Sequence, residues 1–136
     1  MKRNVRDGQR LSLLLVLSLA LTLGCTRSSL QGPADPEKAR AALQDALESW
    51  QRGESVEAMR QRKPQVVVID PDWERGQRLV SFKMAEDKEF RGLNLRCRVD
   101  LTLEDGKGQR REKKVAYSVH TQPLPNITRE ESTPTD

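Results

Sequence analysis

The chain has 136 residues, of which 35% are hydrophobic, 4% aromatic and 32% charged, and this length allows one ordinary domain. With one His and two Cys residues, it offers few groups for the commoner catalytic constellations or for His/Cys metal sites. The net charge is +4, but residues 1–24 hold four of the 24 Lys and Arg residues and one of the 20 Asp and Glu residues. Without that segment the chain is near +1, which argues against a nucleic-acid-binding protein.

Residues 1–24 have the parts of a secretory signal peptide. Residues 1–10 are positively charged, and residues 11–23 (LSLLLVLSLALTL) form an uncharged run dominated by Leu. This run is shorter than the roughly 20 apolar residues that a membrane-spanning helix needs. The pattern predicts a signal peptide over residues 1–24 that directs the protein out of the cytoplasm.

The apolar run ends at Gly24-Cys25, which resembles the lipobox of bacterial lipoproteins. In that family the Cys thiol receives a diacylglycerol and the peptide is cut just before it, which implies that Cys25 carries the lipid and that Gly24 is the residue before the cut. Thr22-Leu23 departs from the family pattern, which commonly has Leu followed by a small residue. An ordinary secretory signal with an incidental Cys, and an uncleaved anchor, are the two other interpretations.

The lipoprotein resemblance implies an address in the cell envelope, facing the periplasm or the exterior. The partner is then the membrane itself, through acylated Cys25, since two or more acyl chains make anchoring stable. Thr26 follows the Cys where inner-membrane lipoproteins of diderm bacteria have Asp, which favours the outer membrane. Residues 25–35 are small and polar with one Gly and one Pro, and they predict a lipidated Cys followed by a flexible tether.

Two helices are expected next. Asp35 is placed to cap a helix that has Pro36 at its first position, and Gly53 follows its end. Ser55 is placed to cap a second, short helix that runs to about Arg62. The inward stripe of the first helix has apolar residues at helical spacing: Ala39, Ala42, Leu43, Ala46, Leu47 and Trp50.

From residue 65 the pattern becomes typical of strands. Residues 66–69 are an apolar run, either a strand buried on both faces or an edge strand over the helix. Apolar side chains then alternate along residues 78–86, 93–104 and 115–119, and residues 105–108 (DGKG) are typical of a hairpin turn. The inward positions in these three strands are Val80, Phe82, Met84, Leu93, Leu95, Cys97, Val99, Leu101, Leu103, Val115, Tyr117 and Val119.

These elements predict an α+β fold over residues 36–122, with an N-terminal helix and a short helix packed on an antiparallel sheet of about four strands. The order resembles the cystatin-like arrangement, which includes cone-shaped domains, and this likeness rests on element order alone. Residues 123–136 have little apolar content after Pro123 and Pro125 and predict a disordered tail.

Few residues are candidates for chemistry. Cys97 lies among inward-facing residues and is expected to be a buried small hydrophobe rather than a reactive thiol. His120 ends the last strand without a neighbouring nucleophile or acid, which is typical of a solvated His. The sequence therefore predicts no enzyme, no catalytic residue, no cofactor and no metal site.

Residues 70–74 (DPDWE) place three carboxylates at alternate positions in a turn. A calcium loop of the helix-loop-helix type also needs Gly at its sixth position and Glu at its twelfth, where this chain has Arg75 and Ser81, so a specific calcium site is not predicted. Trp73 in the same segment is a candidate exposed aromatic contact. The other interpretation is a Trp folded over the end of the core.

The outward positions of the strands are rich in cations. Arg96, Arg98 and Lys114 form a candidate face for an anionic partner, either an envelope protein or an anionic polymer; an ordinary solvated sheet face is the plainer interpretation. Together these features predict a membrane-tethered envelope lipoprotein with a non-catalytic accessory or structural role that acts through protein contacts. The alternative is small-molecule or glycan binding in a pocket between helix and sheet.

Overall fold

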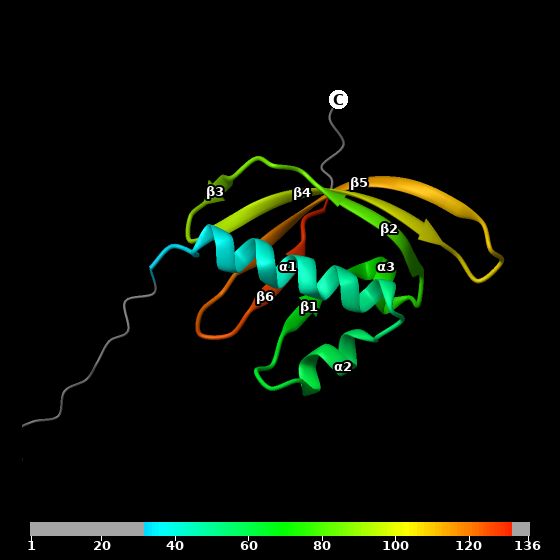
Figure 1. Cartoon of the computed structure of the whole chain (residues 1–136), viewed down its shortest axis with the longest axis horizontal. Coiled ribbons are helices and arrows are strands. Elements are labelled where there is room, and N and C mark those ends of the chain that lie inside the picture. The colour runs from blue at the N-terminus through cyan, green and yellow to red at the C-terminus, as the bar shows by residue number, and fades with distance from the viewer. Residues whose placement is uncertain (1–31, 132–136) are drawn as a thin grey trace, which may run out of the picture. The chain divides into compact units, whose positions relative to one another are not determined.

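The computed structural model describes residues 32–131 (Figure 1). The predicted signal peptide, the predicted lipidation site Cys25 and most of the predicted tether lie outside the described residues, as do residues 132–136. The elements, in chain order, are α1 (Pro36–Gln51), α2 (Val56–Gln61), β1 (Val67–Ile69), α3 (Pro71–Glu74), β2 (Arg78–Met84), β3 (Glu89–Arg91), β4 (Asn94–Glu104), β5 (Arg110–His120) and β6 (Asn126–Arg129).

The fold is α+β, as predicted, and the sheet curls over α1 (Figure 1). The strands lie in the order β1-β6-β5-β4-β2, with β3 paired to β4. The expectation of about four antiparallel strands is wrong, because the sheet has six strands and β1 runs parallel to β6. The expected strand at residues 66–69 is β1, which lies at an edge of the sheet. The two strands that the sequence did not predict, β3 and β6, have only three or four residues each, too few for a period of two to show.

The chain after Pro125 is not the disordered tail that its composition predicted. Residues Asn126–Arg129 form β6, in which Ile127 is fully buried. The pairing continues one residue further, since the Glu130 N–H donates to the Ala116 carbonyl at 2.9 Å. The folded unit also starts before α1, because Ala34 is 4% exposed and its N–H donates to the Leu93 carbonyl. The domain therefore extends beyond the predicted bounds of 36–122 at both ends.

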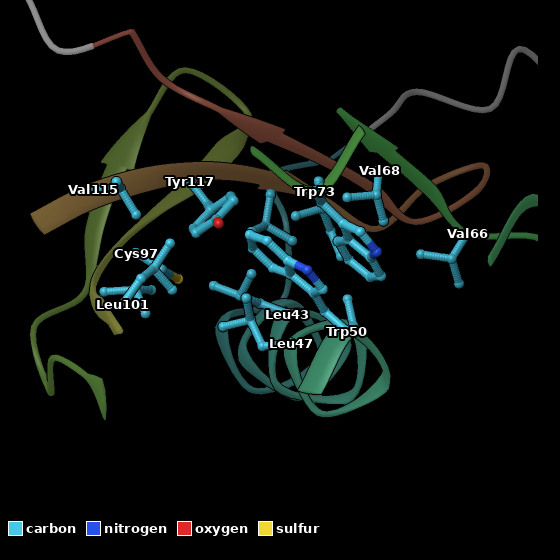
Figure 2. Close-up of a cluster of buried hydrophobic side chains, with 14 of the residues drawn as sticks. Leu43, Leu47, Trp50, Val66, Val68, Trp73, Cys97, Leu101, Val115 and Tyr117 are labelled. Atoms are coloured by element: carbon cyan, nitrogen blue, oxygen red, sulfur yellow. The ribbon is translucent and has the colours of Figure 1, made fainter. Parts of the chain in front are cut away.

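The helix starts are as predicted. The Asp35 carboxylate accepts from the N–H groups of Glu37 and Lys38, and Ser55 accepts from the Ala58 N–H. The predicted stripe of α1 faces the sheet, with Ala42 at its border and the other five residues buried. Figure 2 shows Leu43, Leu47 and Trp50 pointing from α1 toward the sheet residues Leu101 and Tyr117, all of them at most 2% exposed.

Strand β2 differs from the expected alternation at its start. The sequence placed Val80 with Phe82 and Met84 on the inner face, but Leu79 is the residue that is buried. The cause is a register shift between Leu79 and Ser81 in the pairing with β4. This bulge adds one residue to β2. The inward alternation that holds from Phe82 onward is therefore shifted by one residue before the bulge, where Leu79 faces inward instead of Val80.

Side chains of α1 bond to carbonyls within β2 and at both of its ends, along the edge of the sheet. The guanidinium of Arg40 donates to the Ala85 carbonyl, the indole of Trp50 to the Gln77 carbonyl, and the amide of Gln51 to the Val80 carbonyl. The donor–acceptor distances are 2.7, 2.7 and 2.9 Å. Because an open edge can pair with other chains, these contacts both fix the helix and protect the sheet from edge-to-edge association.

Leu47→Asp tests the packing of α1 on the sheet. Leu47 is 1% exposed, and an unpaired carboxylate there costs several kcal/mol, much of the roughly 5–15 kcal/mol that stabilises a domain. We expect thermal melts to lose cooperative unfolding. Ala41→Asp is the matched control, since Ala41 lies on the exposed face of the same helix and should keep a cooperative melt. A Leu47→Asp variant that melts like the control would contradict the packing.

Candidate functional site

The segment expected as a turn forms a short helix with two buried carboxylates. In α3, Asp70 is the N-cap and Pro71 the first helical residue. One oxygen of Asp70 accepts from the N–H groups of Asp72 and Trp73 at 2.8 and 3.0 Å. The side chains of both Asp70 and Asp72 are 0% exposed, so each requires partners inside the protein.

Asp70 is joined to the sheet by two further hydrogen bonds. The Tyr117 hydroxyl on β5 donates to Asp70 at 2.6 Å, and the Arg129 guanidinium on β6 donates to it at 3.0 Å. Burial and the neighbouring Asp70 carboxylate raise the pKa of Tyr117 far above its ordinary value. The phenol therefore acts as a fixed hydrogen-bond donor.

Asp72 is surrounded by cations from three elements. Burial opposes its ionised form, but hydrogen bonds from Lys113, Arg75 and Arg129 outweigh that effect and hold the pKa of Asp72 well below its usual range. Its nitrogen–oxygen distances are 2.8 Å to Arg75 at the C-cap of α3, 3.1 Å to Arg111 and 2.7 Å to Lys113 of β5, and 2.6 Å to Arg129 at the end of β6. Asp72 thus fastens α3 to the end of the sheet.

The expectation of Trp73 as an exposed aromatic contact is wrong. Trp73 is 6% exposed and stacks on Trp50 of α1, with ring centroids 5.0 Å apart and planes at 2° (Figure 2). Its indole N–H donates to the Glu54 carbonyl at 2.8 Å. Trp73 is therefore the residue folded over the end of the core, and it joins α3 to α1.

The cations predicted for the outer face do lie together, around an open groove of about 1030 Å³ that we call the outer-face groove. Its floor is the face of the sheet opposite α1. Its lining has five cationic and three acidic side chains, and consists of Lys83, Ala85, Arg91, Arg96, Arg98, Asp100, Lys114, Val115, Ala116, Glu130 and Glu131.

The cations of this groove differ in how far carboxylates neutralise them. Arg96 is 22% exposed and bonds to Glu130 at 2.7 Å and Glu89 at 3.1 Å, which raises its pKa. Arg98 is 60% exposed and pairs with Asp87 at 2.9 Å. Within residues 32–131, Lys83 and Lys114 make no ion pair. Arg96 thus holds the groove together, while Lys83, Arg98 and Lys114 are accessible to a ligand.

A second hollow of about 260 Å³ lies beside α3, and we call it the α3 hollow. Arg129 lines it, although the Arg129 side chain is only 10% exposed. Burial works against the charge of Arg129, but Asp70 and Asp72 outweigh it and raise its pKa. The full lining is Pro71, Arg75, Lys113, Lys114, Val115, Arg129, Glu130 and Glu131, of which Lys114, Val115, Glu130 and Glu131 also line the outer-face groove.

The other candidate residues lie apart from these cations. Cys97 is a free thiol that is fully buried on the inner face, and burial raises its pKa, as expected for a small core hydrophobe. His120 lines a third hollow, of about 490 Å³, near Leu124 and Asn126, and its Nδ1 accepts from the Gln122 N–H. Leu43, Leu47 and Tyr117 fill the space between α1 and the sheet, and all three hollows lie outside it.

Sequence reasoning missed Arg111, Lys113 and Arg129 as partners of a buried acid. A signal for the first two was present in the sequence. Arg111 and Lys113 stand at the same alternate positions as the inward residues Val115 and Tyr117. A cation at a core-facing strand position implies a buried carboxylate nearby. Arg129 lay in the segment expected to be disordered.

Asp72→Asn tests the buried charges, since it leaves four cations without their common anion. Removing one partner of a buried ion pair costs about 3–5 kcal/mol. Because the folded-state pKa of Asp72 is lowered, its contribution is complete above the unfolded-state pKa of about 4 and is lost as pH falls. We expect the difference in unfolding free energy between wild type and variant to shrink by about 1.4 kcal/mol per pH unit below about pH 4. Urea titrations at several pH values measure it, and a pH-independent difference would refute the role of the Asp72 charge.

No family model matches the sequence, and neither the curated proteins nor the solved structures compared with it give a match. Among residues 32–131, the structure has no helix of the length and apolar character needed to cross a membrane. The candidate site consists of two adjoining basic hollows, one at the outer face and one beside α3, and buried carboxylates hold Arg75, Lys113 and Arg129 in the second.

Proposed function

We propose that the chain is a membrane-tethered envelope lipoprotein with a non-catalytic accessory role, which contacts an anionic partner through the outer face of its sheet. The observation that carries this proposal is the grouping of Arg96, Arg98 and Lys114 around one open groove. Cationic side chains in a concave surface attract anions and steer their approach. The tether is supported by the sequence of residues 1–25 alone.

The surroundings of the reactive side chains support a role in binding rather than catalysis. Cys97 is buried with a raised pKa, which suppresses the thiolate that a nucleophile requires. The carboxylates of Asp70 and Asp72 are engaged by cations of the protein. His120 lines the third hollow, whose lining includes neither of these carboxylates.

A finer description of the fold belongs to the same proposal. Helix α1 crosses a curled sheet and is followed by the short helix α2, and within residues 32–131 no strand precedes α1. This order supports the cystatin-like, cone-like arrangement. In such an arrangement the inner face of the sheet is covered by the helix, so the outer face is the broad surface available to a partner.

Cys25→Ser tests the tether. In a diderm bacterial host fed a fatty-acid probe, we expect the wild-type chain to be labelled and to sediment with membranes. The variant should lose the label and leave the membrane fraction, because the acyl chains supply the hydrophobic anchor. Cys97→Ser is the matched control and should keep the label. Unchanged labelling of Cys25→Ser would refute the lipoprotein assignment.

Replacing Lys83, Arg98 and Lys114 together with Ser tests the groove. Because these side chains are exposed, we expect the free energy of unfolding to change by no more than about 0.5 kcal/mol per site. Arg96 is left intact because it bridges Glu89 and Glu130. In pull-downs from detergent-solubilised membranes, wild type should retain a partner at low salt and lose it at high salt, and the variant should not retain it. Capture that depends on neither salt nor the variant would refute the groove as the contact surface.

A further inference from the structure

The two basic hollows meet along β5 and the end of β6. Their linings share Lys114, Val115, Glu130 and Glu131. Together they are lined by eight cationic and three acidic side chains. Six of these cations are ion-paired, in part with four carboxylates outside the linings, and within residues 32–131 Lys83 and Lys114 make no ion pair. The groups that this elongated surface presents to solvent are therefore mainly cationic, because Asp70 and Asp72 are fully buried beneath it, and such a surface suits an extended polyanion.

Ion pairs hold the α3 hollow, and Glu130 links it to the outer-face groove. Arg129 is fixed by Asp70 and Asp72, and the next residue, Glu130, bonds to Arg96 in the neighbouring groove at 2.7 Å. Lys113 and Arg75 are held by Asp72 as well. Cations that are already positioned lose little conformational entropy when a ligand binds, so binding is stronger than to mobile surface lysines.

The lining favours a polymer over a folded acidic protein. Stable protein interfaces have an apolar centre enriched in aromatic residues. The uncharged residues of the two linings are Ala85, Ala116, Val115 and Pro71, and the exposed Phe90 is in neither. What the surface offers is a row of Arg and Lys side chains, the groups that bind phosphate oxygens.

We propose that the outer-face groove and the α3 hollow form one continuous site for an extended polyanion with repeated phosphate groups. Lys83 and Arg98 contact one part of the chain, Lys114 lies between the hollows, and Arg75, Lys113 and Arg129 contact the next part. This inference rests on the proposed function for the first hollow and adds the second hollow and the class of ligand. A polymer that occupies both hollows gains affinity because its second contact is intramolecular.

The test uses the full-length chain in detergent and two probes, long-chain inorganic polyphosphate and tripolyphosphate. We expect the long chain to bind about 100-fold more tightly, as for linked contacts. We also expect a steep salt dependence, with the slope of log K against log[salt] falling by about 0.7 for each contact removed. Fluorescence anisotropy of labelled probes measures both quantities.

Three variants locate the contacts. Lys83→Ser with Arg98→Ser alters only the outer-face groove, and Arg75→Ser with Lys113→Ser alters only the α3 hollow. Because the second pair touches Asp72, Arg75→Ser alone is the milder form, which leaves three cations on Asp72. Lys63→Ser with Lys107→Ser removes two exposed cations outside both hollows and is the matched control. We expect each hollow variant, but not the control, to weaken long-chain binding by about tenfold or more, as loss of charged phosphate contacts does.

The outcomes separate this inference from the proposed function. If only the outer-face variant weakens binding and both probes bind equally, the extension into the α3 hollow is wrong and the groove remains. If wild type binds neither probe but retains a membrane protein in the salt-sensitive pull-down, the ligand is an acidic protein and the polymer is wrong. If the hollow variants match the control with both probes and in the pull-down, both proposals fail.

Discussion

The rest of the structure depends on the contact between two buried carboxylates and one buried guanidinium, those of Asp70, Asp72 and Arg129. Removing such ions from water costs several kcal/mol each, which their attraction offsets only when the remaining hydrogen-bonding positions are filled. Here they are filled, since Asp70 accepts from two backbone N–H groups, a phenol and a guanidinium, and Asp72 meets four cations. These contacts fix the positions of α3, β5 and β6 relative to one another, because Asp70 and Asp72 reach their cations only in this arrangement.

The same short helix holds the two layers together. Trp73 stacks on Trp50 of α1, while Asp70 and Asp72 bind the sheet, so a four-residue helix joins the long helix to the end of the sheet. Since β6 and the residue after it pair with β5 only over residues 116–120, the remaining half of β5 would otherwise be an open edge. Asp72 contacts Arg111 and Lys113 in that half. The α3 hollow follows from this, because it lies where β6 ends and α3 begins to cover β5.

The sequence predicted those parts of the fold in which a period repeats over many residues. The stripe of α1 and the alternation of β4 each extend over ten residues or more, and their buried faces are as expected except at Leu93, which lies before β4 and is 42% exposed. Strands β3 and β6 are too short for a period of two to show. The apolar run at residues 66–69 predicts β1, but its partner in the sheet, β6, lies far along the chain. Ile127 shows this well: a single apolar residue between prolines and polar residues becomes fully buried because β5 and β1 pair on both sides of it. No local pattern contains that information.

The residues of the candidate site also differ in whether the sequence could predict them. Arg96, Arg98 and Lys114 could be grouped from sequence because alternation in β4 and β5 fixes which side chains share a face. Arg129 and Glu130 could not, since they come to the site through β6. Their arrival changes what the cations do: Glu130 engages Arg96 and makes it structural, whereas the buried acids immobilise Arg129 beside a hollow that Lys114 joins to the groove. From alternation alone this surface is a basic sheet face. Strand β6 adds Arg129 and Glu130 to it, so the surface extends into the α3 hollow and offers a polyanion an elongated path.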